Sequence, residues 1–203
     1  MSLQQNVKVQ KVKTTLKNIA SIQMGYSFRS RIPSMSTGTV AVIQMKDLTD
    51  DNTVNLHDLK FIDINKFNEN HFVNKGDLIF RSRGLSTTSA IVSDDPGIAV
   101  VSAPLFKIRI NNPNIMPEYL NWYISQLPAQ VFLASHARGT TQKMISKESL
   151  GELEVFVPSM ERQKVIVALA ALADEEQRIM KKLEIKRKQY ISATLIRKAQ
   201  EKR

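Results

Sequence analysis

The sequence predicts an α+β protein made of a mixed, β-rich domain with small helices, followed by one long C-terminal helix that forms a coiled coil. Two observations lead to this fold class. Short apolar runs separated by turn signals fill residues 40–110, which is typical of strands. No glycine or proline occurs between Pro158 and Arg203, so a single uninterrupted helix is expected there. We therefore expect two domains, residues 1–157 and residues 158–203.

The first element is expected to be a short helix after a polar, lysine-bearing lead-in over residues 1–13. Thr15 is a suitable N-cap. The apolar face of this helix is predicted to consist of Leu16, Ile19, Ala20 and Ile22. Gly25 is expected to end it, because glycine favours the backbone conformation found just after a helix.

Strands are predicted next, where apolar residues run together between turn signals. The expected strands are 40–45, 61–64, 78–83, 90–92, 98–101 and 105–110, with turns at 74–77 and 94–97. The last strand alternates apolar and basic residues, which predicts that one of its faces is buried.

Helices and one more strand complete the predicted domain. Pro117 suits a helix start, since its missing N–H has no partner there in any case. Apolar residues at helical spacing follow as far as Pro128, and a second helix is expected over 129–136. One helical turn is expected within 145–150 and a final strand over 153–157.

The C-terminal helix is predicted to begin after Ser159, which is a good N-cap. Its apolar positions keep the 3-4 spacing of a coiled-coil seam: Val165, Leu169, Leu172, Ile179, Leu183, Tyr190 and Ala193. Glu176 and Lys186 occupy two further seam positions and are charged. A helix of roughly 60 Å is too long to bury this stripe on its own domain, so a partner helix is expected.

The charge balance favours a polyanionic partner. The chain has 203 residues and a formal net charge of +10. Residues from Pro158 onward hold 12 of the 29 basic and 6 of the 19 acidic side chains, which is over half of the excess. There is no cysteine and no signal-peptide or membrane-spanning pattern, so we expect a cytoplasmic protein that does not contact a membrane.

The sequence lacks the patterns of the common catalytic and cofactor sites. His57, His71 and His136 are far apart and form no metal-binding spacing. Phosphate-binding glycine loops and a serine nucleophile elbow are also missing from the sequence. We therefore expect no catalytic residue, no metal and no cofactor.

Three loops carry side chains that suit DNA. They are residues 25–31, residues 81–89 and residues 138–143, and each combines arginine or lysine with hydroxyl side chains and glycine. Arginine can bind guanine or phosphate through two hydrogen bonds, and glycine allows close approach of the backbone. Ordinary solvated loops have a similar composition, so the prediction depends on finding three of them in one basic protein.

The order of several segments resembles the target-recognition half of a type I restriction–modification specificity (S) subunit. The matching stretches are 16–20 with 25–29, 42–48, 75–84, 117–123, 139–145 and 153–158, with Glu161-Arg162-Gln163 opening the long helix. The candidate DNA-binding residues are Tyr26, Ser27, Arg29, Arg31, Lys46, Arg81, Arg83, Thr87, Thr88, Arg138, Thr140, Thr141 and Lys143. The resemblance implies a target-recognition domain over 1–157 and a spacer helix over 158–203.

The resemblance also implies partners: double-stranded DNA, methyltransferase (modification) subunits docked on the spacer, and the restriction subunit. A full S subunit has two recognition domains and two spacer helices, so this chain resembles a half-subunit, either a natural one or a fragment. Two copies pairing their helices antiparallel would present two readers to a bipartite target with inverted half-sites. Two alternatives remain open, a basic interaction scaffold without sequence-specific DNA binding and a small DNA-modifying enzyme of unrecognised type.

Overall fold

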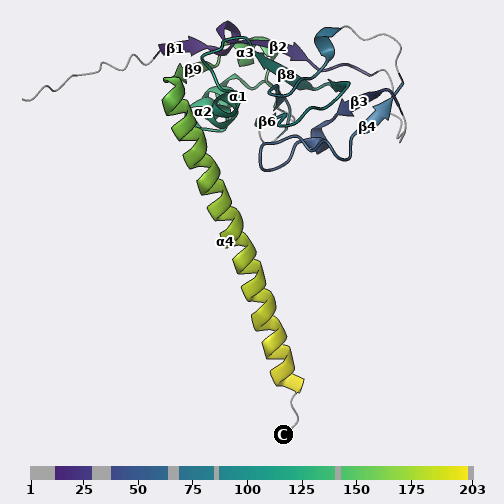
Figure 1. The fold of residues 1–203 in the computed structure, drawn as a ribbon, viewed down its shortest axis with the longest axis vertical. Coiled ribbons are helices and arrows are strands. Elements are labelled where there is room, and N and C mark those ends of the chain that lie inside the picture. The colour runs from purple at the N-terminus through teal and green to yellow at the C-terminus, as the bar shows by residue number, and fades with distance from the viewer. Residues whose placement is uncertain (1–11, 29–37, 64–68, 85–86, 140–142, 201–203) are drawn as a thin grey trace, which may run out of the picture. The chain divides into compact units, whose positions relative to one another are not determined.

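The computed structural model describes residues 12–28, 38–63, 69–84, 87–139 and 143–200. The chain divides into two compact units, Met1–Gln163 and Lys164–Arg203. The first unit holds all the strands of the described residues, and the described residues of the second, 164–200, are helical (Figure 1). The predicted fold class, a β-rich domain with small helices and one long C-terminal helix, is confirmed.

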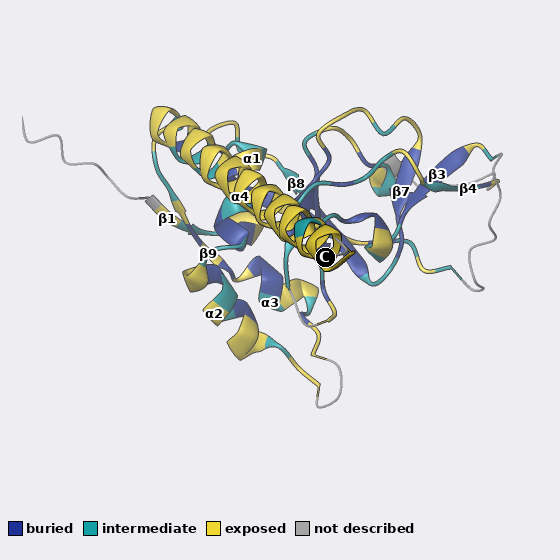
Figure 2. Ribbon diagram, turned by 90° about the horizontal axis from the view of Figure 1, so that it is seen from below, coloured by how far each residue is buried: buried dark blue, intermediate teal, exposed yellow. Residues whose placement is uncertain are grey.

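The described strands of the globular unit form three sheets. The first joins β1 (Val12–Thr15) to β9 (Glu154–Val157); the second has the order β2 (Ala20–Met24), β8 (Leu105–Ile110), β5 (Leu78–Arg81), β6 (Ser89–Ile91); the third has the order β4 (Lys60–Ile62), β3 (Val40–Ile43), β7 (Ala99–Val101). All neighbours are antiparallel except β3 and β7, which run parallel. Figures 1 and 2 show β3 and β4 at the opposite side of this unit from β1 and β9.

The prediction of a helix that starts at Thr15 and ends at Gly25 is wrong. Only a 3-10 turn, η1 (Leu16–Asn18), forms there, and the Thr15 side chain makes no cap hydrogen bond. Residues 20–24 are strand β2, in which Ala20 and Ile22 are buried and Ser21 is exposed. This period of two fits a strand, and pairing of Ile22 with Ile108 on β8 stabilises it. Long-range pairing therefore overrides a helical pattern of only a few residues.

The lead-in predicted for residues 1–13 is also shorter than expected, because β1 begins at Val12. It pairs along its whole length with β9, from Val12 opposite Val157 to Thr15 opposite Glu154. Lys13 forms an ion pair with Glu154 at 2.6 Å. The beginning and the end of the globular unit are thus joined as one two-stranded sheet.

The other predicted strands lie where the apolar runs are, with ends shifted by one or two residues, and 105–110 is reproduced without change. One core cluster gathers side chains from five strands: Ala41, Ile43, Ile79, Ala90, Ala99, Val101 and Leu105. The turns at 74–77 and 94–97 are confirmed by main-chain bonds to the carboxylates of Asp77 and Asp95. Two more 3-10 turns are η2 (Met45–Asp47) and η3 (Glu69–His71).

The described part of the globular unit has three short helices, α1 (Pro117–Ile124), α2 (Leu127–His136) and α3 (Lys147–Gly151). Helix α1 packs against β6 and α3 against β2, and α2 contacts both of these helices. Pro117 stands at the start of α1, as predicted. Tyr119 is buried, and its hydroxyl donates to the main-chain carbonyl of Phe156 at 2.6 Å. This bond connects α1 to strand β9.

The long helix α4 (Met160–Gln200) has 41 residues. Gln163 is fully buried and bonds to the main-chain groups of Asn114, Met116 and Pro158. The first turn of α4 therefore belongs to the globular unit, and the units divide between Gln163 and Lys164, six residues after the predicted boundary. Beyond that turn the helix is exposed almost throughout (Figure 2). Within the described part of the chain, no helix combines the length and apolar character needed to cross a membrane.

Candidate nucleic-acid interface

The first predicted loop, residues 25–31, begins directly after β2 with a glycine that has very little space around it. A Cβ at Gly25 would lie 2.6 Å from the main-chain carbon of Ser102, so only glycine fits there without a shift. Tyr26 follows, with its ring 4.9 Å from that of Phe28 and 5.8 Å from that of His71. Ser27 is exposed. Tyr26 thus belongs to a small aromatic cluster, while Ser27 faces solvent.

Arg81 and Arg83 of the second loop differ in position. The Arg81 guanidinium is half-buried, and its Nη2 donates to the Leu48 carbonyl at 2.5 Å. Its buried Nε has no partner among the described residues. Arg83 comes after β5 has ended and is exposed. Arg81 therefore supports the segment that follows η2, and Arg83 is exposed to solvent.

The second and third predicted loops meet at Met144. Arg83 Nε lies 3.1 Å from the Met144 sulfur, and the main chains of Arg138 and Met144 exchange two hydrogen bonds of 2.8 and 2.9 Å. The Ile145 N–H donates to the Ser82 carbonyl at 2.9 Å. A shallow open hollow results, and we call it the arginine hollow; it is lined by Arg83, Arg138, Gly139 and Met144. Two exposed guanidinium groups from loops more than 50 residues apart in sequence line this one hollow.

The remaining candidates divide into those near the hollow and those apart from it. Lys143 is exposed beside Met144. The Thr87 hydroxyl bonds to Gln130 at 3.2 Å, and Thr88 is partly buried. Lys46 lies on η2 and pairs with Asp47 at 2.8 Å. Four candidates lie outside the described residues: Arg29, Arg31, Thr140 and Thr141.

The sequence alone did not predict the charged network that involves β8. Its pattern assigned Lys107 and Arg109 to a half-buried strand and gave them no partners. Lys107 is 5% exposed, and its ammonium donates to the carbonyls of Asn70 and Phe72. Arg109 binds the buried Asp77 carboxylate through two bonds of 2.7 and 2.8 Å. The bond to Asp77 raises the pKa of Arg109. This network fastens residues 70–77 to strand β8.

Burial, followed by the neighbouring Arg109, lowers the pKa of Lys107 from 10.5 to about 8. Between pH 8 and 10.5 the unfolded chain therefore binds more protons at this residue than the folded chain, so folding stability gains with pH in this window. Burial raises the pKa of Tyr119 from 10.0 to about 12, which has the opposite effect above pH 10. We expect the free energy of unfolding measured in urea to rise from pH 8 to pH 10 relative to a Lys107→Met variant. Parallel pH profiles for the two proteins would contradict this assignment.

No three His, Asp or Glu side chains gather closely enough to hold a metal ion in the described part of the chain.

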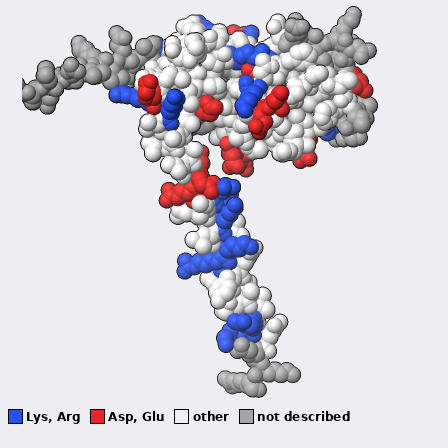
Figure 3. All heavy atoms as spheres, viewed as in Figure 1, with Lys and Arg blue, Asp and Glu red and all other residues white. Residues whose placement is uncertain are grey.

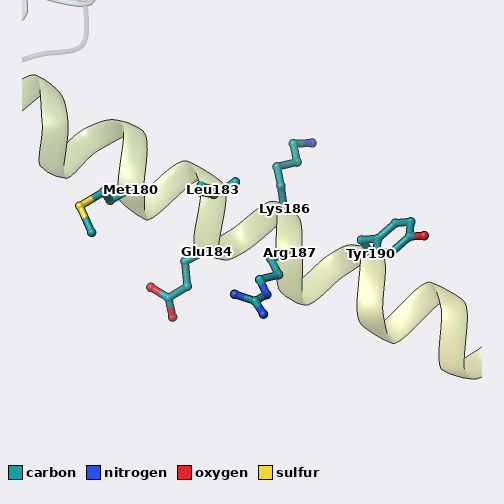
Figure 4. A pocket seen from close by; sticks show the side chains of 6 residues that line it. All are labelled: Met180, Leu183, Glu184, Lys186, Arg187 and Tyr190. Carbon is teal, nitrogen blue, oxygen red and sulfur yellow. The ribbon is translucent and has the colours of Figure 1, made fainter.

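The second unit presents a surface of a different kind, because α4 carries exposed apolar side chains between its charged ones (Figure 3), Leu183 and Tyr190 among them (Figure 4). The predicted partner-helix residues are between 55% and 72% exposed on α4: Val165, Leu169, Leu172, Ile179, Leu183 and Tyr190. The surfaces available for binding are thus the loops of the globular unit and an apolar stripe on the helix.

Comparison with known proteins identifies the family. The family model of the type I restriction modification DNA specificity domain matches residues 8–187. The chain belongs to this family. The matched range includes nearly all of the globular unit and α4 as far as Arg187. No curated protein matches the sequence.

Solved structures share the fold of this specificity-domain protein. The S subunit of a type I restriction-modification system from M. genitalium superposes with a TM-score of 0.58 at 16% identity, over 93% of this chain and 45% of that one. The HsdS subunit from Thermoanaerobacter tengcongensis gives 0.59 at 19% identity, over 81% and 37%. A structure concerned with complex assembly and conformational transition of the type I R-M system gives 0.69 at 17% identity, over 90% and 43%. The chain spans less than half the length of each.

Proposed function

We propose that this specificity-domain protein reads double-stranded DNA with its globular unit and directs methyltransferase subunits, and the restriction subunit, to that sequence. The observation that carries the proposal is the arginine hollow. Two arginines that lie far apart in sequence expose their guanidinium groups at one hollow, next to Lys143 and the main chain of Gly139. In a member of a DNA specificity family, this is the surface best suited to contact a base edge and the adjacent phosphate.

The chemistry of the hollow fits a groove of DNA. A guanidinium donates two parallel hydrogen bonds to O6 and N7 of guanine or to two phosphate oxygens. The Met144 sulfur that Arg83 contacts is a weak acceptor, so exchanging this contact for one to DNA costs little. Met144 itself offers an apolar surface for a thymine methyl group. Lys143 adds a phosphate contact whose strength falls with salt.

The helix supplies the assembly function in this proposal. Its exposed stripe is the spacer surface through which two copies pair and on which methyltransferase subunits dock. A helix of about 60 Å reaches along nearly two turns of B-DNA. The recognised target is then bipartite, with inverted half-sites separated by bases that are not read. The chain itself contributes no catalytic residue or cofactor, and the chemical steps belong to its partners.

Selection from a random DNA pool tests the proposal. The full chain, with the methyltransferase subunits of its own system, is incubated with the pool at about 150 mM salt and excess nonspecific competitor, because specificity without a stated salt concentration is uninterpretable. We expect enrichment of one bipartite sequence over the pool by about 1000-fold or more. Retention of DNA without any enriched sequence would favour a basic scaffold. Methyl transfer by the chain alone would favour an enzyme.

A further inference from the structure

A single glutamine side chain joins three segments of the globular unit. Gln130 lies within α2, and its amide nitrogen donates to the main-chain carbonyl of Ile124 at 2.7 Å and to that of Thr87 at 3.0 Å. Its amide oxygen accepts a hydrogen bond from the Thr87 hydroxyl at 3.2 Å. Both hydrogens of the amide nitrogen are therefore used. The end of α1, the helix α2 and the second predicted loop, residues 81–89, meet at this side chain.

Arg83 lies between two fastenings of the second loop. One residue before it, the main-chain carbonyl of Ser82 accepts a hydrogen bond from the Ile145 N–H at 2.9 Å. Four residues after it, Thr87 is held by Gln130. A short segment can pivot about one fastening, whereas two fastenings restrict its direction as well. The direction of the Arg83 side chain therefore depends on both attachments.

Helix α2 connects this fastening to the other arginine of the hollow. Gln130 lies six residues before the end of α2, which is about 9 Å along the helix axis, and Arg138 follows directly after that end. From Arg138 main-chain hydrogen bonds lead to Met144, whose sulfur contacts Arg83. The contacts thus form a closed ring around the arginine hollow. The described residues that line the hollow do not include Gln130, which closes the ring from outside.

We infer that Gln130 is a positioning residue for DNA reading, which fixes the direction of the Arg83 side chain relative to Arg138 without itself touching DNA. The inference rests on the proposed function and adds a residue to its machinery. A guanidinium recognises guanine through two parallel hydrogen bonds, which tolerate only small displacements. Its attraction to phosphate is less demanding, because a charge acts over a longer distance. Loss of the Gln130 bonds therefore weakens sequence-specific binding and spares nonspecific binding.

A neighbouring glutamine shows what such an amide does as a purely structural group. Gln126 precedes α2, is half-buried like Gln130, and donates from its amide nitrogen to the Trp122 carbonyl at 2.9 Å. This bond stays within the connection of α1 to α2. Gln130 makes a bond of the same kind to Ile124. The two bonds to Thr87 are what distinguish Gln130, and they are the bonds that lead to the DNA-reading loop.

Replacement of each glutamine by methionine gives a matched pair of variants. Methionine is close to glutamine in length and helix propensity and is also uncharged, so the substitution removes hydrogen bonds and keeps net charge. For full-length Gln130→Met, we expect the affinity for the selected DNA to fall about tenfold, as for loss of one well-placed base contact. Affinity for unrelated DNA, and its salt dependence, should stay unchanged. Gln126→Met should bind both DNAs like the wild type.

Two results of these titrations would overturn the inference. Wild-type affinity of Gln130→Met for the selected DNA would show that reading does not need the fastening. An equal fall in affinity for selected and unrelated DNA would show a general loss of structure in place of a displaced arginine. Urea denaturation of both variants ensures that binding is compared between folded proteins.

A double-mutant cycle tests whether Gln130 acts through Arg83. Arg83→Ala removes the guanidinium that Gln130 positions, so adding Gln130→Met to Arg83→Ala should cost no further specific affinity. A loss as large as that in the wild-type background would mean that Gln130 acts by another route, and it would overturn the inference.

Amide hydrogen exchange measures the fastening in the absence of DNA. The Arg81 N–H donates to the Thr88 carbonyl at 2.9 Å, next to the residue that Gln130 holds. Because local opening breaks this bond, we expect the Arg81 amide to exchange faster in Gln130→Met than in Gln126→Met. Equal exchange in the two variants would contradict the fastening and with it the inference.

Failure of this inference and failure of the proposed function can be told apart. If Arg83→Ala/Arg138→Ala loses the selected sequence while Gln130→Met retains it at wild-type affinity, the hollow reads DNA and only the inference fails. If both variants retain the selected sequence at wild-type affinity, the hollow does not read DNA and the proposed site fails as well.

Discussion

Replacing both Arg83 and Arg138 with alanine is expected to abolish retention of the selected DNA sequence while the protein stays folded. Both side chains are exposed at the arginine hollow, so their loss removes little from the core. Each guanidinium that binds a base contributes about 2 kcal/mol of discrimination, and two together amount to roughly a thousandfold in affinity. The measurement is a titration of the labelled selected site in the presence of nonspecific competitor.

Two control variants separate this effect from loss of charge and from loss of structure. Arg178→Ala removes one positive charge from α4, where Arg178 pairs with Glu175 at 2.5 Å, and should leave specificity unchanged. Arg81→Ala removes the bond to Leu48 and should lower the melting temperature more than it lowers specificity. Unchanged affinity in the Arg83→Ala/Arg138→Ala protein would exclude the hollow from the interface.

The strands and helices that the sequence predicted correctly are those with strong local signals. Residues 105–110 alternate clearly, Pro117 begins α1, and an unbroken helical pattern follows Pro158. The error at residues 20–24 has a physical cause. The four apolar residues from Leu16 to Ile22 fit either a helix or a strand, and pairing with β8 decides between these two structures. That pairing joins residues more than 80 positions apart, which no local pattern can reveal.

The candidate site was predictable by composition but not by geometry. The 81–84 and 138–143 loops were recognised separately, and their meeting depends on hydrogen bonds from Ile145 to Ser82 and between Arg138 and Met144. The sequence also treats Arg81 and Arg83 alike. The structure distinguishes them because β5 ends at Arg81, which leaves Arg81 held against Leu48 and Arg83 exposed. Asp77 was predicted only as a turn residue, and its bond to Arg109 is another long-range contact.

Replacing Asp77 with alanine is expected to destabilise the globular unit far more than the loss of one turn bond would. Asp77 is 3% exposed, and its carboxylate accepts from the Arg109 guanidinium and from the Asn74 N–H at 2.8 Å. Without it, Arg109 and the buried Lys107 lose the negative charge beside them. Because the Arg109 side chain is 36% exposed, water screens part of this effect, and we expect a loss of about 2 kcal/mol in urea denaturation of the full chain.

A second turn in the same unit supplies the matched control. Asp95 is exposed, and its carboxylate accepts a hydrogen bond from the Gly97 N–H at 3.0 Å. The Asp95→Ala substitution therefore removes a turn bond without leaving a buried cation. We expect it to lower the free energy of unfolding by about 1 kcal/mol. If the charge left behind is the cause of the Asp77 effect, then Asp77→Ala combined with Arg109→Met should be more stable than Asp77→Ala alone. Equal losses for Asp77→Ala and Asp95→Ala would mean that the turn bond, and not the charged network under β8, accounts for the role of Asp77.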